Sequence, residues 1–186
     1  LRINEQRMRV QKQAFNAAIA KEPLPYILNI LVELVDEEMN GKARTAFFLR
    51  GRGHNKLHPV MDAGNMPPNF LIEMQETLSS HGLLPCGMAL PNGEPVITTD
   101  IFKNHESNES HSIAEKYDIQ SCWSFPIKSK DNKGYGCFCM YFAGTTTKPT
   151  QKELILIDII TQSAAVIILN YTEAEERARA EETLRK

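Results

Sequence analysis

The chain has few cysteines, little net charge and no long uninterrupted apolar run. A formal net charge of −2 over 186 residues gives no basic stripe of the kind that nucleic-acid-binding domains carry. No apolar run reaches the roughly 20 residues that a bilayer span needs, because Asp158, Gln162 and Ser163 interrupt the longest candidate, 154–169. The first residues are polar and charged, unlike a signal peptide. These absences favour a cytoplasmic domain without direct membrane insertion and without a nucleic-acid partner.

The four cysteines do not form the paired framework of a small secreted protein. Cys137 and Cys139 lie two residues apart on one predicted strand and could supply half of a thiolate metal site. A second pair with suitable spacing is missing, so the pattern favours core thiols over a metal centre. The five histidines are scattered through predicted turns, strands and loops, which also argues against a metal or haem site.

Residues 121–142 contain two aromatic-rich runs joined by a polar turn, a pattern typical of a β-hairpin. The first run places Trp123 and Phe125 on one face and Cys122 and Ser124 on the other. The second run is apolar on both faces, which predicts a central strand covered on both sides.

The rest of the chain predicts helices at both ends and short elements between them. Apolar residues at steps of three and four favour a helix that begins near Pro25 and stops near Asn40. The other expected elements are a helix over 1–20, strands over 43–50, 56–63 and 95–100, a helix from 67 or 68, a loop over 103–111 and a helix over 112–118.

A capping box at Thr150–Glu153 predicts the start of a helix that continues to Lys186. Apolar residues repeat along it every seven positions, which is the spacing of a coiled-coil seam. We therefore expect this helix to dimerise and to continue into a further domain; the alternative is a single core-packed helix with a solvated tail. The seam consists of Ile157, Ile160, Ala164, Ile167, Tyr171, Ala174 and Ala178.

The order of these elements resembles GAF domains of sensor histidine kinases. The residues that carry the resemblance are Pro85–Ala89, Gly93–Asp100, Cys122–Ile127 and Pro149–Glu153. The resemblance implies an α+β, profilin-like fold: a central antiparallel sheet with the N- and C-terminal helices packed on one face and a pocket on the other. It divides the chain into an N-terminal signalling or dimerisation helix (1–24), a GAF domain (25–171) and the start of a C-terminal signalling helix (172–186).

The resemblance also implies a non-catalytic sensory module in a two-component signalling protein. We expect it to bind a small molecule of unknown identity, to form a homodimer through its terminal helices and to be linked covalently to a kinase or PAS output domain. Which face of the sheet forms the pocket stays open. The candidate pocket residues are Cys86, Phe102, His111, Tyr117, Trp123 and Phe125.

Two alternatives remain: a ligand-free dimerisation module, and a free methionine-R-sulfoxide reductase. Cys86 matches one cysteine of that reductase family, but the loop over 103–113, where the family carries its reactive cysteine, has none. No cysteine is followed by histidine, as bilin attachment would favour, and the residue set of cyclic-nucleotide GAF domains is not recognisable.

Overall fold

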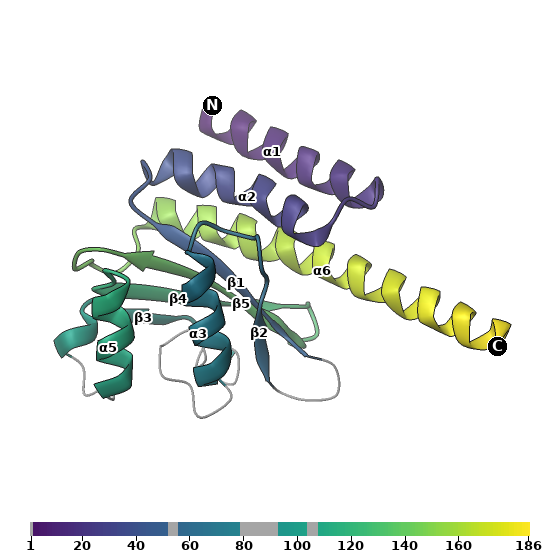
Figure 1. Cartoon of the computed structure of the whole chain (residues 1–186). Coiled ribbons are helices and arrows are strands. Elements are labelled where there is room, and N and C mark those ends of the chain that lie inside the picture. The colour runs from purple at the N-terminus through teal and green to yellow at the C-terminus, as the bar shows by residue number, and fades with distance from the viewer. Residues whose placement is uncertain (1, 52–55, 79–92, 104–107) are drawn as a thin grey trace.

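The computed structural model describes residues 2–51, 56–78, 93–103 and 108–186. An antiparallel sheet of five strands lies between two helical layers, as expected for the α+β fold (Figure 1). The strand order is β2-β1-β5-β4-β3. The strands are β1 (Arg44–Arg50), β2 (Leu57–Pro59), β3 (Val96–Thr98), β4 (Ser121–Lys128) and β5 (Gly134–Phe142).

The predicted central strand is β5, which pairs with β1 on one side and β4 on the other. The predicted hairpin forms, with Trp123 opposite Met140 and Phe125 opposite Phe138. Because neighbouring residues of a strand point to opposite faces, β4 and β5 each contribute buried side chains to both layers of the core.

The first helical layer contains the two ends of the chain. The helix α6 (Gln151–Arg185) contacts β4 and β5, and α2 (Leu24–Glu38) packs beside it. The helix α1 (Arg2–Ile19) packs against α2 and α6 on the side away from the sheet, where Gln11 Nε2 donates to Ser163 Oγ at 2.9 Å (Figure 1). Both terminal helices therefore lie on the same side of the sheet, as predicted, with α1 outside α2 and α6.

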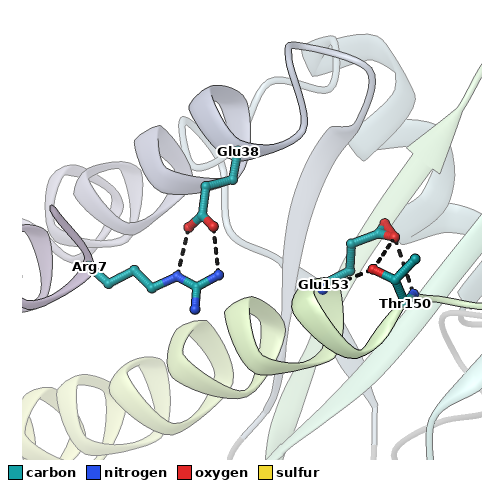
Figure 2. Close-up of polar contacts among 4 residues, drawn as sticks. All are labelled: Arg7, Glu38, Thr150 and Glu153. Carbon is teal, nitrogen blue, oxygen red and sulfur yellow. Dashed lines mark hydrogen bonds and ion pairs between the residues drawn. The ribbon is translucent and has the colours of Figure 1, made fainter. Parts of the chain in front are cut away.

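The start of α6 has the capping box that the sequence predicts. The backbone N–H of Glu153 donates to Thr150 Oγ1 at 3.2 Å, and the backbone N–H of Thr150 donates to Glu153 Oε1 at 3.2 Å (Figure 2). By length and composition α6 is also the one described helix that could cross a membrane. Seven of its apolar residues pack in the core, which is the arrangement of a core helix in a globular domain: Leu156, Ile157, Ile160, Ala164, Ala165, Ile167 and Ile168.

The opposite face of the sheet is covered by α3 (Pro68–Leu78), the short 3₁₀ helix η1 (Ile101–Lys103) and α5 (Asn108–Lys116) (Figure 1). The loop expected over 103–111 is wrong in its second part, because α5 begins at Asn108. Although this stretch is polar overall, α5 has an inward face whose residues Ser110, Ile113 and Ala114 are buried.

Candidate sensory site

The face of the sheet beneath α3 and α5 is built around Phe70. Its ring meets Tyr117 at a centroid distance of 5.2 Å and Tyr141 at 5.1 Å, both edge to face. These geometries are favourable for aromatic pairs and fix the ring positions more strictly than aliphatic contacts would. The cluster contains Ala46, Phe48, Leu57, Met66, Phe70, Leu71, Met74, Ile101, Ile113, Ala114, Ile119, Cys122, Cys137, Cys139 and Tyr141.

The structure divides the five predicted pocket residues that it describes between the two faces of the sheet. Phe102 and His111 lie side by side, with ring centroids 5.5 Å apart, and Tyr117 belongs to the aromatic group around Phe70. Trp123 and Phe125 belong instead to the core beneath the terminal helices, on the other side of the sheet. Cys86 lies outside the described residues.

Strand alternation explains this separation. Trp123 pairs with Met140 and packs at 4.6 Å from Phe142, and its indole N–H donates to Thr146 Oγ1 at 3.1 Å. The face shared by Trp123 and Phe125 is therefore filled by side chains of α2 and α6. A site on the α3/α5 face would use the alternate residues of β4 instead, Cys122 and Ser124, which the sequence does not distinguish from core residues.

Two polar atoms near this face have no hydrogen-bond partner among the described residues: Nε2 of His111 and the hydroxyl of Tyr117. Burial raises the pKa of the Tyr117 phenol, and the carboxylate of Glu73 raises this pKa further. Buried polar atoms normally find a partner, which makes these two atoms candidates for contact with a ligand. Glu73 also forms an ion pair with Lys116, which connects α3 to α5 beside Tyr117.

The same face contains three buried cysteines, Cys122, Cys137 and Cys139. The Sγ atoms of Cys137 and Cys139 are 3.9 Å apart, and Ser124 Oγ is 3.5 Å from Cys139 Sγ. Throughout the described ranges no three His, Cys, Asp or Glu side chains gather where they could hold a metal ion. Their complete burial fits the interpretation of these cysteines as core thiols, since a reactive thiol must be reachable.

An open groove of about 1250 Å³ lies on the other side of the sheet, between α6 and the β4–β5 turn. We call it the hairpin groove. Apolar and polar side chains of α6 line one side of it, and charged residues of both signs line the turn side, namely Lys128, Lys130, Asp131 and Lys133. The sequence patterns did not reveal it. It is formed by the outer side of α6 and by a turn whose polar residues are also expected of any solvent-exposed turn. The residues on its α6 side include Leu154, Ile155, Asp158, Gln162, Ala165, Val166 and Leu169.

The alternation of side chains along β4 connects the two faces of the sheet. In β4 the order Cys122, Trp123, Ser124, Phe125 places alternate residues in the α3/α5 core and in the terminal-helix core. Both cores are closely packed. A shift of β4 or β5 caused by a change in one core therefore also moves the side chains that the strand contributes to the other core. The arrangement can therefore carry a packing change from the α3/α5 face to α6.

The GAF domain sequence profile matches residues 22–169, which is most of the chain. The chain belongs to the GAF domain family. Over 99 residues, 53% of this chain, it is 30% identical to the methyl sulfide methyltransferase-associated sensor of Methanosarcina acetivorans. The chain spans about a tenth of the length of that relative.

Solved structures share the fold at low sequence identity. The free methionine-R-sulfoxide reductase of Neisseria meningitidis is similar with a TM-score of 0.66 and 14% identity, covering 92% of this chain and 91% of the other. The GAF domain of an Acinetobacter phosphoenolpyruvate-protein phosphotransferase gives 0.63 and 11%, covering 91% and 97%. A domain of a two-component sensor histidine kinase protein from Sinorhizobium meliloti gives 0.59 and 14%, covering 87% and 96%. These likenesses show the fold alone.

Proposed function

We propose that this GAF domain is the non-catalytic sensory module of a cytoplasmic histidine kinase. A small molecule binds on the α3/α5 face and changes the packing of β4 and β5. The terminal helices, paired with those of a second copy, pass this change to a covalently linked kinase or PAS output domain.

The observation that carries this proposal is the division of β4 and β5 between two closely packed cores. The α3/α5 face supplies aromatic surface around Phe70 together with the two polar atoms on His111 and Tyr117 that lack partners in the described part of the chain. Apolar walls with a few polar groups are typical of small-molecule sites. The likeness to the sensor of Methanosarcina acetivorans supports the signalling context.

Trp123 offers a direct test, because it is the only tryptophan and lies on the face opposite the proposed site. Native mass spectrometry of the protein purified from its own cytosol should detect a bound small molecule. Its removal and return should change the emission of Trp123 and the hydrogen exchange of α6. A ligand binds one packing better than another, and only that difference can shift the populations.

Two substitutions test whether the ligand binds on the α3/α5 face. His111→Ala should weaken both ligand binding and the Trp123 response, whereas Ile72→Ala, at a side chain 47% exposed on α3, should leave both unchanged. If no small molecule co-purifies and none in a metabolite panel shifts the unfolding temperature, the ligand-free dimerisation module is the better description.

The reductase alternative makes a separate prediction, which is turnover of free methionine-R-sulfoxide with a thiol reductant. The cysteines that the structure describes are fully buried, so they do not favour it. Measurable turnover would replace the sensory proposal with an enzymatic one.

A further inference from the structure

Arg44, the first residue of β1, binds the C-terminal end of α5 from a distant part of the chain. Its Nη1 donates to the backbone carbonyl of Tyr117 at 2.8 Å, and its Nη2 donates to the carbonyl of Asp118 at 2.5 Å. Carbonyl groups at this end of a helix lack partners within the helix, and the helix dipole makes the end partly negative. The planar guanidinium suits the position both as a charge and as a pair of donors.

The chain leaves α5 through a tight turn to which these two bonds belong. Asp118 has a left-handed backbone with a φ of 54°, and the N–H of Ile119 donates back to the carbonyl of Ala114 at 2.8 Å. The chain then enters β4 at Ser121. The backbone itself therefore connects α5 to β4. Arg44 adds a second connection, which leads to β1.

The residues on either side of Arg44 contact the other helical layer. The backbone N–H of Thr45 donates to Asn65 Oδ1 at 2.5 Å, and Asn65 Nδ2 donates to Asp36 Oδ1 on α2 at 3.0 Å. Ala43 is 1% exposed and belongs to the core beneath the terminal helices. The start of β1 therefore links α5 on one face of the sheet to α2 on the other (Figure 1).

Arg44 also adjoins the aromatic group of the candidate sensory site. It lies opposite Tyr141 in the β1–β5 ladder, and the rings of Tyr141 and Tyr117 both pack edge to face against Phe70. A ligand that displaced Tyr117 would move the carbonyl that Arg44 binds, because that carbonyl belongs to the same residue. The guanidinium is thus placed where a change at the aromatic group reaches β1.

We propose that Arg44 is a positioning residue that couples α5 to α2 across the sheet. When the C-terminal end of α5 shifts, the guanidinium follows the two carbonyls, and residues 43–45 carry the shift to the end of α2. Glu38 at this end of α2 binds Arg7, so the shift also reaches α1. This inference rests on the proposed sensory function and adds a route to the N-terminal helices, beside the route through β4 and β5 to α6.

Amide hydrogen exchange followed by NMR tests this route without a ligand. Ser112→Gly, at an exposed residue in the middle of α5, should increase the opening of α5 about two- to threefold, because glycine weakens a helix. If Arg44 couples the layers, two amides beyond it should also exchange about twofold faster. They are the N–H of Gly41, which donates to the Asp36 carbonyl at the end of α2, and the N–H of Thr45. Gln75→Gly, at an exposed residue of α3, is the matched control and should leave both amides unchanged.

Arg44→Met removes the donors and keeps a long side chain. In this background Ser112→Gly should still loosen α5, but the exchange of Gly41 and Thr45 should no longer respond. A residue that only caps α5 would leave these two amides unresponsive in the natural chain as well. Arg44→Lys keeps the charge without the paired donors, and it replaces Arg44→Met with the same expected loss if that variant does not fold.

A response of Gly41 and Thr45 that persists in Arg44→Met, or that is missing with Arg44 in place, overturns the inference. Either result leaves the proposed ligand site on the α3/α5 face standing, because no ligand takes part in the measurement. Conversely, a search that finds no ligand overturns the sensory proposal and leaves the coupling through Arg44 as a measured property of the domain.

Discussion

The guanidinium of Arg7 on α1 binds both carboxylate oxygens of Glu38 at the end of α2. Its Nε lies 3.0 Å from Oε2 and its Nη2 lies 2.6 Å from Oε1, while each side chain is only 8% exposed (Figure 2). Parallel hydrogen bonds of this kind are the strongest geometry that an arginine and a carboxylate can adopt. The pair, with Gln11 bonded to Ser163, fixes the otherwise polar α1 to the two helices beneath it.

Breaking one side of this pair should cost more than removing the pair. Glu38→Gln leaves the guanidinium buried without a counter-charge, and we expect a loss of about 3 kcal/mol in the free energy of unfolding. Arg7→Met with Glu38→Leu removes both charges and should cost about 1 kcal/mol or less. Urea unfolding followed by far-ultraviolet circular dichroism measures both differences.

Lys186 and Glu182 provide the exposed comparison, because they lie 3.5 Å apart with side chains 78% and 69% exposed. Glu182→Gln should change the stability by less than about 0.5 kcal/mol, since solvent screens such pairs. If Glu38→Gln lowers the free energy of unfolding by as little, the ion pair of Arg7 and Glu38 does not hold α1 against α2 and α6.

Gly136 is required where β5 passes β1. A Cβ added there would lie 2.0 Å from the carbonyl oxygen of Phe48, which is backbone and cannot move aside cheaply. Gly136→Ala should therefore displace the central strand and cost about 3 kcal/mol or more. Gly144→Ala is the control, because nothing lies within 4 Å of its added Cβ. Thermal unfolding of the two variants should separate them, and equal midpoints would contradict the close strand contact.

The fold could be predicted from the sequence largely because its signals are local. The period-two pattern around Trp123 and Phe138 fixes which residues share a face, and the Thr150–Glu153 capping box fixes where α6 begins. Both signals depend only on residues close together in the sequence, so tertiary packing does not alter them. The position of α5 was harder to predict, because the sequence around Ser110 is polar overall and is also typical of a loop.

The candidate site could be predicted only in part. Alternation along a strand shows which residues share a face of the sheet, but not whether the terminal helices or α3 and α5 cover that face. Trp123 and Phe125 are large aromatics, and such residues suit a pocket and a core equally well. The heptad spacing along α6 has a related ambiguity, because Ile157 and Ala164 of the predicted seam are also buried in the core of the domain. Periodicity identifies a buried face without naming its partner.

The cap of α6 should make a measurable contribution to stability. Thr150→Ala removes the hydroxyl that accepts from the Glu153 N–H, and we expect a loss of about 1 kcal/mol in the free energy of unfolding. Thr147→Ala, at an exposed hydroxyl in the preceding loop, should change stability by only a few tenths of that amount. Chemical unfolding of the two variants makes the comparison, and a larger loss in Thr147→Ala would be inconsistent with the cap.

Asp36 should make stability depend on pH near the acid end. Burial raises the pKa of its carboxyl above the ordinary value of 3.8, and the hydrogen bond from Asn65 Nδ2, at 3.0 Å, opposes this shift. A raised pKa means that the folded protein holds the proton more tightly than the unfolded chain does. The stability that Asp36 contributes is therefore full below the ordinary pKa and is lost as pH rises through the folded pKa.

Comparing Asp36→Asn with the natural chain isolates this effect. The variant cannot titrate, so its stability relative to the natural chain should increase as pH rises just above 3.8 and stay constant at higher pH. Asn65→Ala should extend the rise to higher pH, because it removes the hydrogen bond that favours the carboxylate. Urea midpoints across this range, with the Asp36 carboxyl followed by NMR, give the measurement. A difference that falls with rising pH would mean that Asn65 outweighs burial and that the carboxylate is the favoured form.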